Sequence, residues 1–316
     1  MIPKLKNLIS IGILLIIVAL FIYYIIQHIS DFQQLSLVNP FYLVILLALF
    51  IFTYYLISII TKNLLYPLGV KLKGFEAFAL SIVTGFYHLI TPFRGGTITR
   101  AVYLKKKHEF SYTNFLASLA GKYLIIFLTA SFIGLITTLF INYIYGSFSW
   151  IIFFVFLAIF LPLLLIVVLS PKLSLTKNNF INRFIKVVNG WHLIKNNKRV
   201  IIIITLVSIL QLIIGAFMFY FQFRVFGIEV EFIKCLFLAS IGSLSILIAI
   251  TPAGLGINEA VIVFSALTIG ITPAQSLSVA LLGRVIGFLV LFILGPTFSA
   301  FLIKHNPNSN SNQNDK

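Results

Sequence analysis

Charged side chains interrupt the apolar segments of this sequence. Six of them lie in or beside apolar runs: Glu76, Arg94, Arg100, Lys122, Glu259 and Arg284. Each would cost at least about 2.5–3.5 kcal/mol at the centre of a bilayer if it had no partner. The four cations outnumber Glu259, the one acid deep in an apolar run, and a bound anion is the simplest way to make this surplus tolerable. The pattern therefore predicts an electropositive site that takes an anionic ligand.

Two elbows of proline and glycine accompany these charges. The first, residues 91–96, contains Pro92, Gly95 and Gly96, and the second, residues 251–259, contains Pro252, Gly254 and Gly256. Proline removes a backbone donor and clashes with the preceding turn, so each elbow is expected to end a helix. Short helices that restart near Thr97 and Asn258 would point free N–H groups into the site. The glycines would let a ligand approach the backbone closely.

Structural roles are an alternative interpretation of the same side chains. Arg94 and Arg100 could extend to the inner lipid headgroups, and Lys122 could reach the membrane interface because it lies only about ten residues into its helix. Glu259 could pair with Arg284 and hold the fold together, a role that is compatible with ligand binding.

Two uncharged positions near the elbows are also ambiguous. Asn258 could contact a ligand or cap the helix that follows the second elbow. His88 precedes the first elbow, and a structural role is favoured over a proton relay.

The composition is that of a membrane protein. Hydrophobic residues make up 60% of the 316 residues, charged residues only 9%, and the mean hydropathy is +1.09. Soluble domains carry about 25% charged residues, so we expect a polytopic membrane protein with no room for a separate soluble domain. The net charge of +16 fits basic cytoplasmic loops that face anionic lipid. No nucleic-acid-binding motif is present, and nucleic acid is not an expected partner.

The sequence lacks the motifs that several classes of enzyme require. The sequence has no P-loop, no GxSxG elbow and no metal-ligand cluster, and Cys235 is the single cysteine. The apolar segments contain too few acids to support paired-carboxylate catalysis or a chain of proton-relay groups. We therefore expect no enzymatic activity, no metal and no cofactor.

The apolar runs predict an all-α fold with six full spans and two re-entrant helical hairpins. The spans cover about residues 8–29, 40–60, 112–141, 150–169, 200–223 and 273–302, and the hairpins cover about 76–104 and 232–269. The loop 170–199 has seven basic residues and no acid, which places it in the cytoplasm. Both termini are then cytoplasmic in a multi-pass protein of the cell membrane.

The order of these elements predicts an inverted repeat. Within one transmembrane domain (residues 1–303), the halves 1–145 and 150–303 each contain a hairpin between two spans. The hairpins enter from opposite faces, as in transporters whose broken helices meet near the midplane. The tail, residues 304–316, is rich in Asn and Ser and is expected to be disordered.

The second elbow resembles a known family. Residues 251–260, TPAGLGINEA, with Arg284 25 residues after Glu259, look like the second signature of the flippase-like transmembrane region found in lysylphosphatidylglycerol synthetases. The family's first signature resembles Pro-x-Arg-x-Gly-Glu followed by Arg. Pro92, Arg94 and Arg100 match that signature, whereas Gly or Thr stands in place of its Glu. Lys122 takes the place of the later Arg.

The resemblance covers about residues 8–303 and implies a domain that moves a lipid, such as an aminoacylated phosphatidylglycerol, between leaflets. Aminoacyl transfer in that family belongs to a separate soluble domain, so synthetase activity is not expected here. The expected headgroup-binding residues are Arg94, Arg100, Lys122, Asn258, Glu259 and Arg284.

Three hypotheses follow for the function. The first is a flippase-like protein whose cations hold the headgroup of an anionic or aminoacylated phospholipid or a polyprenyl phosphate. The second is a membrane subunit that presents a lipid carrier to a separate glycosyltransferase or synthetase. The third is a structural subunit without transport. The oligomeric state, the direction of transport and the energy source have no signal in the sequence.

Overall fold

The computed structural model describes residues 37–91, 95–146, 149–169, 173–176, 194–248 and 254–304, with isolated positions at 23, 26, 182, 185, 192 and 251. In chain order the described helices are α3 (Phe41–Leu65), the 3-10 helix η1 (Tyr66–Leu68), α4 (Gly74–Ile90), α5 (Gly95–His108), α6 (Tyr112–Tyr145), α7 (Trp150–Leu169), α9 (Lys198–Val225), α10 (Phe232–Leu244), η3 (Ser245–Leu247), α11 (Ile257–Leu267) and α12 (Pro273–Lys304). Pro92, Arg94, Pro252, most of the predicted first span, most of the basic loop and the tail after Lys304 lie outside the described residues.

Five helices are long and apolar enough to cross a membrane. They are α3 with η1, α6, α7, α9 and α12. Many of their large apolar side chains are exposed, as on α7, where Trp150, Phe154 and Leu165 face outward. Apolar exteriors of this kind suit contact with lipid chains. The predicted all-α polytopic membrane fold is therefore confirmed, and five of the six predicted spans correspond to helices in the described residues.

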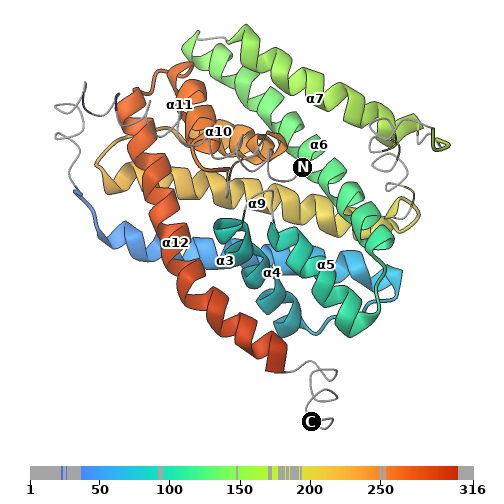
Figure 1. Ribbon diagram of the computed structural model, residues 1–316. Helices are drawn as coiled ribbons and strands as arrows, with labels where there is room; N and C mark the ends of the chain where they lie inside the picture. Colours follow the sequence, from blue (N-terminus) through green and yellow to red (C-terminus); the bar gives the residue numbers. More distant parts are fainter. Residues whose placement is uncertain are drawn as a thin grey trace.

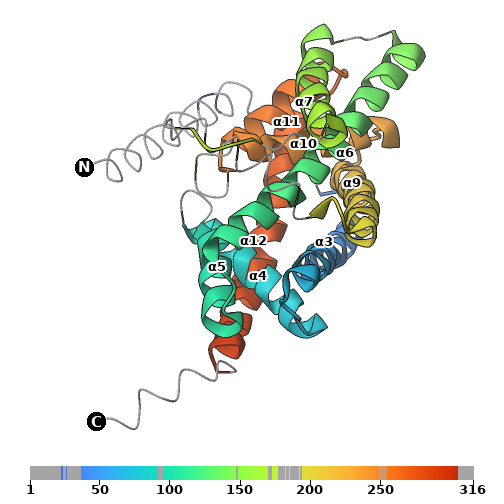
Figure 2. The ribbon, with the colours of Figure 1, turned by 90° about the vertical axis from the view of Figure 1, so that its right-hand side faces the viewer.

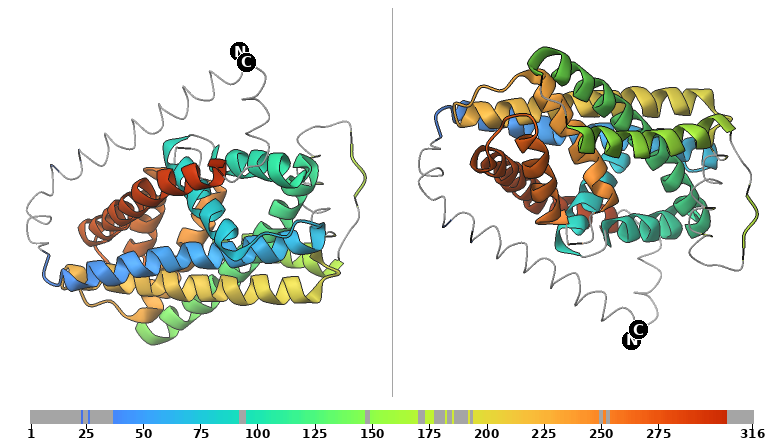
Figure 3. Two further views of the ribbon diagram at one scale, coloured as in Figure 1. Left: turned by 90° about the horizontal axis from the view of Figure 1, so that it is seen from below. Right: turned by 90° about the horizontal axis from the view of Figure 1, so that it is seen from above.

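Helices α3 and α9 form an antiparallel pair that crosses the molecule in Figure 1 and lies toward one side of it in Figure 3. At one end the backbone N–H of Val38, just before α3, donates to the carbonyl of Val225, the last residue of α9, at 2.9 Å. At the other end Ile60 and Leu64 of α3 pack in one buried cluster with Ile204 of α9.

The first predicted hairpin is present as α4 and α5, which pack against each other. Helix α4 ends at Ile90, where Thr91 becomes extended, and α5 begins at Gly95. A Cβ atom at Gly96 would lie only 1.9 Å from the carbonyl oxygen of Thr84. Only glycine therefore lets the start of α5 cross so close to α4.

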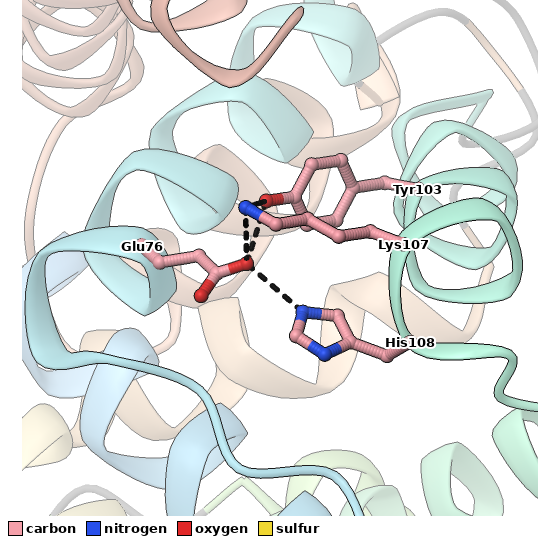
Figure 4. A network of polar contacts seen from close by, with 4 residues as sticks. All are labelled: Glu76, Tyr103, Lys107 and His108. Atoms are coloured by element: carbon pink, nitrogen blue, oxygen red, sulfur yellow. Dashed lines mark hydrogen bonds and ion pairs between the residues drawn. The ribbon is translucent and has the colours of Figure 1, made fainter. Parts of the chain in front are cut away.

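A carboxylate joins the two arms at the base of this hairpin (Figure 4). Glu76, in the first turn of α4, accepts hydrogen bonds through Oε1 from the Tyr103 hydroxyl at 2.6 Å and from Lys107 Nζ at 3.1 Å. His108 Nε2 lies 2.9 Å from the same oxygen. Burial raises the pKa of Glu76, but the hydrogen bonds from Tyr103, His108 and Lys107 outweigh it, so the pKa lies below its ordinary value.

The second hairpin consists of α10, η3 and α11. Helix α10 ends at Leu244, and η3 tightens the chain before the second elbow. The hydroxyls of Ser240 and Ser243 donate to carbonyls four residues earlier. Serines that bond back in this way weaken and bend a helix.

The packing of the two hairpins follows one scheme. Helix α4 packs on α3 and α12, and α10 packs on α9 and α6. Figure 2 shows α4 and α5 in the lower part of the molecule and α10 and α11 in the upper part. These contacts are the ones that two related halves would make across a twofold axis. The inverted repeat itself stays a prediction.

Candidate functional site

A cavity of about 250 Å³ lies between the two hairpins. Its walls come from α3, α4, α5, α6, η3 and the second elbow, so six separate segments of the chain meet around it. Its polar lining consists of Tyr54, Ser81, Thr84, His88, Thr97, Arg100, Lys122, Tyr123, Thr251 and Asn258. We call this space the cationic cavity, because Arg100 and Lys122 are its charged residues.

Arg100 is buried in the wall of the cationic cavity rather than at the membrane surface. Its side chain comes from α5 and is 7% exposed. Its Nε donates to Thr84 Oγ1 at 3.0 Å and Nη1 donates to Thr61 Oγ1 at 3.5 Å. Both threonine hydroxyls donate to carbonyls in their own helices, so their oxygens are free to accept. These two acceptors leave further guanidinium donors for a ligand.

Lys122 reaches the same cavity from α6 and is also 7% exposed. Its Nζ lies 5.5 Å from the ring centroid of Tyr123, within reach of a cation–π contact. None of the ion pairs among the described residues includes Arg100 or Lys122. Two buried cations therefore share one cavity without a carboxylate, and this arrangement favours a bound anion.

Glu259 and Arg284 form the ion pair that the sequence offered as one interpretation. Glu259 Oε1 accepts from Arg284 Nε, and Glu259 is 3% exposed. Its Oε2 accepts from the backbone N–H of Gly256 at 2.7 Å, as a residue at the third position of a helix does in a capping box. Gly256 has φ of +80°, a conformation that glycine adopts without strain. The carboxylate therefore both neutralises Arg284 and holds the start of α11.

Asn258 lies at the boundary between two cavities. The residue that caps α11 is Gly256, and the Asn258 side chain instead accepts from the Ser245 hydroxyl at 2.6 Å through Oδ1. It lines both the cationic cavity and a neighbouring cavity of about 440 Å³. Gly254 leaves room for it, because a Cβ atom there would lie 2.9 Å from the Asn258 amide nitrogen.

The neighbouring cavity contains side chains that sequence reasoning missed. Gln211 and Gln222 of α9 line it together with Ser243, Glu259 and Arg284. We call it the amide cavity. The two glutamines are eleven residues apart, close to three helical turns, and so share one face of α9. Two glutamines at this spacing in an apolar helix indicate a polar face. A neutral amide is a weaker indication of a site than a charged side chain.

The remaining predicted residues have different positions. Gly95 and Gly96 begin α5 against α4 and are not part of the cavity lining, whereas Gly254 is. Arg284 lines the amide cavity and a third cavity of about 220 Å³ between α3, α4 and α12. His88 lines both this third cavity and the cationic cavity. Arg94 and the two elbow prolines lie outside the described residues.

Comparison with curated proteins gives no match. The model of one family, described as the lysylphosphatidylglycerol synthase TM region, matches residues 7–295. The match includes both elbows and every charged residue of the cavities. It agrees with the resemblance carried by residues 251–260 and Arg284. The chain therefore belongs to the lysylphosphatidylglycerol synthase transmembrane-region family.

Proposed function

We propose that this protein binds the phosphate-bearing headgroup of a lipid between its two hairpins and moves that lipid between leaflets. The observation that carries the proposal is the pair of buried cations, Arg100 and Lys122, in a cavity without a neutralising carboxylate. Buried charge is costly in lipid unless it has a partner or a function. A phosphate ester supplies the missing negative charge, and the family is one of membrane regions associated with lipid modification.

The residues take separate roles in this proposal. Arg100, held by Thr84 and Thr61, presents its remaining donors to phosphate oxygens, a geometry for which a guanidinium is well suited. Lys122 adds a second charge from α6. Arg94, in the first elbow, is proposed as a third cation from the sequence pattern alone. The acyl or prenyl chains stay in the bilayer while the headgroup passes through the interior.

The two hairpins provide a route across the membrane in this proposal. As the two halves of an inverted repeat, they enter from opposite faces and meet at the cationic cavity. Rocking of one half against the other would then open the cavity to each leaflet in turn. Aminoacyl transfer is not part of the proposed activity. In this proposal both termini lie in the cytoplasm, and the protein lies in the cell membrane.

The proposal can be tested by transport of a labelled anionic phospholipid in proteoliposomes, with a leaflet-specific quencher as the readout. Arg100→Gln and Lys122→Gln are each expected to lower the transport rate at least about tenfold, the effect of about 1.4 kcal/mol. Lys105→Gln, an exposed residue on the same hairpin, is the matched control and should transport normally. Folded Arg100→Gln and Lys122→Gln proteins that transport at the normal rate would contradict the proposal.

A further inference from the structure

Among the described residues, the cationic cavity has no acid that could receive a positively charged headgroup. The chain has seven Asp and Glu residues, of which the structure describes five. Glu76 is held by three partners at the base of the first hairpin, and Glu109, Glu229 and Glu231 lie in the connections outside the helices. Glu259, the one acid at the described cavities, is neutralised by Arg284. The amino groups of an aminoacylated lipid therefore meet only positive charge there.

The amide cavity offers a different chemistry. Gln211, Gln222, Ser243 and Asn258 line it and supply amide and hydroxyl groups that both donate and accept hydrogen bonds. Neutral groups of this kind match the hydroxyls of a glycerol or a sugar. A volume of about 440 Å³ is in the range of small-molecule sites.

Gln222 is placed for this role by the packing of α9 against α12. The residue is 4% exposed, and its Nε2 would lie 2.7 Å from a Cβ atom at Gly283. The absence of a side chain at Gly283 therefore gives the amide its space. Ile246 and Asn258 line both cavities, so the two spaces adjoin at these residues.

We propose that the cationic and amide cavities together form one headgroup site that selects lipids by charge and by hydroxyl content. The phosphate binds at Arg100 and Lys122, and a neutral hydroxylated group attached to it binds among the amides. The preferred ligand is a phosphate lipid with a glycerol or sugar headgroup, and an aminoacylated, cationic headgroup is rejected. This inference rests on the proposed function for the identity of the ligand as a lipid.

Competitive binding in mixed micelles tests the selectivity without any need for transport. A fluorescent phosphatidylglycerol bound to the full chain is displaced by phosphatidylglycerol, phosphatidylinositol, phosphatidic acid or lysylphosphatidylglycerol. Phosphatidylglycerol or phosphatidylinositol should bind at least about tenfold more tightly than the lysyl lipid, whose amino groups meet positive charge. Both should also bind more tightly than phosphatidic acid, because the amides that it leaves buried and unpaired are costly. The better of the first two identifies the hydroxylated group as glycerol or sugar-like.

Two substitutions of Gln222 distinguish the contribution of the amide cavity to binding from that of the cationic cavity. Gln222→Leu should weaken binding of phosphatidylglycerol about tenfold and leave phosphatidic acid unchanged, since only the former has hydroxyls to lose. Gln222→Glu should shift the preference toward lysylphosphatidylglycerol by supplying the missing carboxylate. Lys105→Gln serves as the control and should leave all four affinities unchanged.

The outcomes are distinguishable from those of the transport assay. Equal binding of lysylphosphatidylglycerol and phosphatidylglycerol would overturn the charge selection. Equal binding of phosphatidic acid and phosphatidylglycerol, with no effect of Gln222→Leu, would overturn the role of the amides. Selective binding without transport would leave this inference standing and remove the proposed function, whereas transport without selectivity would do the reverse.

Discussion

The ion pair between Glu259 and Arg284 shows how one carboxylate serves two purposes. One oxygen accepts from Arg284, and the other accepts from the N–H of Gly256. Arg100 and Lys122 lack such a partner and rely on threonine hydroxyls and an aromatic ring. At the residue scale, the charged residues described at the cavities are therefore of two kinds. Arg284 is neutralised by Glu259, whereas Arg100 and Lys122 share a cavity without a carboxylate among the described residues.

Glu259→Gln and Arg284→Gln should each lower the free energy of unfolding by about 3 kcal/mol, because each leaves an uncompensated buried charge. Glutamine at position 259 can still accept from Gly256, so the start of α11 is preserved. The double variant should cost clearly less than the sum of the single variants. Chemical unfolding in detergent micelles measures these values.

The exposed ion pair between Arg224 and Glu229 provides the control for these single and double variants. Glu229 is 80% exposed, so Glu229→Gln should cause no measurable loss of stability. Strictly additive costs for Glu259 and Arg284 would show that the two residues are not coupled.

At the scale of elements, polar contacts hold the two arms of each hairpin together. In the first hairpin Glu76 binds three residues in the last two turns of α5 (Figure 4). In the second it is the contact between Ser245 and Asn258. Small residues let the arms approach, as Gly96 does at Thr84. The positions of the cavity walls depend on both sets of contacts.

The Glu76 network makes the stability of the first hairpin dependent on pH. The pKa of Glu76 is lowered from 4.5 in the folded protein, so its contribution is fully present above the ordinary pKa and is lost as the pH falls through the lowered value. Glu76→Gln should therefore lower the Tm at pH 7, and this deficit should shrink as the pH falls below 4.5. Thermal unfolding at several pH values measures the difference. A deficit that stays constant down to pH 3 would show that the carboxylate charge is not what stabilises the hairpin.

At the scale of the whole molecule, the hairpins pack on opposite partners around the α3–α9 pair (Figure 1). Helix α4 packs on α12, and α10 packs on α6, so the last span of each half holds the hairpin of the other half. The cavities lie where these elements meet. A site built in this way depends on both halves at once.

The proposed opposite entry of the hairpins can be tested by labelling of single cysteines in sealed vesicles. Cys235 is fully buried and can be changed to Ala. Lys106→Cys, at the base of the first hairpin, should react only from the cytoplasmic side, and Thr272→Cys, after the second hairpin, only from the other side. Both positions are exposed. Labelling of both from the same side would contradict the inverted arrangement.

Much of the site was predictable from the cost of charge in lipid. Arg100, Lys122, Glu259 and Arg284 stood out because few charges occur in apolar segments, and each lines or borders a cavity. Gln211 and Gln222 were missed because neutral amides are cheaper to bury and carry a weaker signal.

The sequence by itself determined the class of the protein and identified the charged residues of the candidate site. Apolar runs of span length, two proline–glycine elbows and a surplus of buried cations are local properties, and they can be read one segment at a time. The tertiary structure alone decided which charges neutralise each other. Glu259 pairs with a residue 25 positions away, while Arg100 and Lys122 face a shared cavity, because helix packing sets the distances over which charges interact.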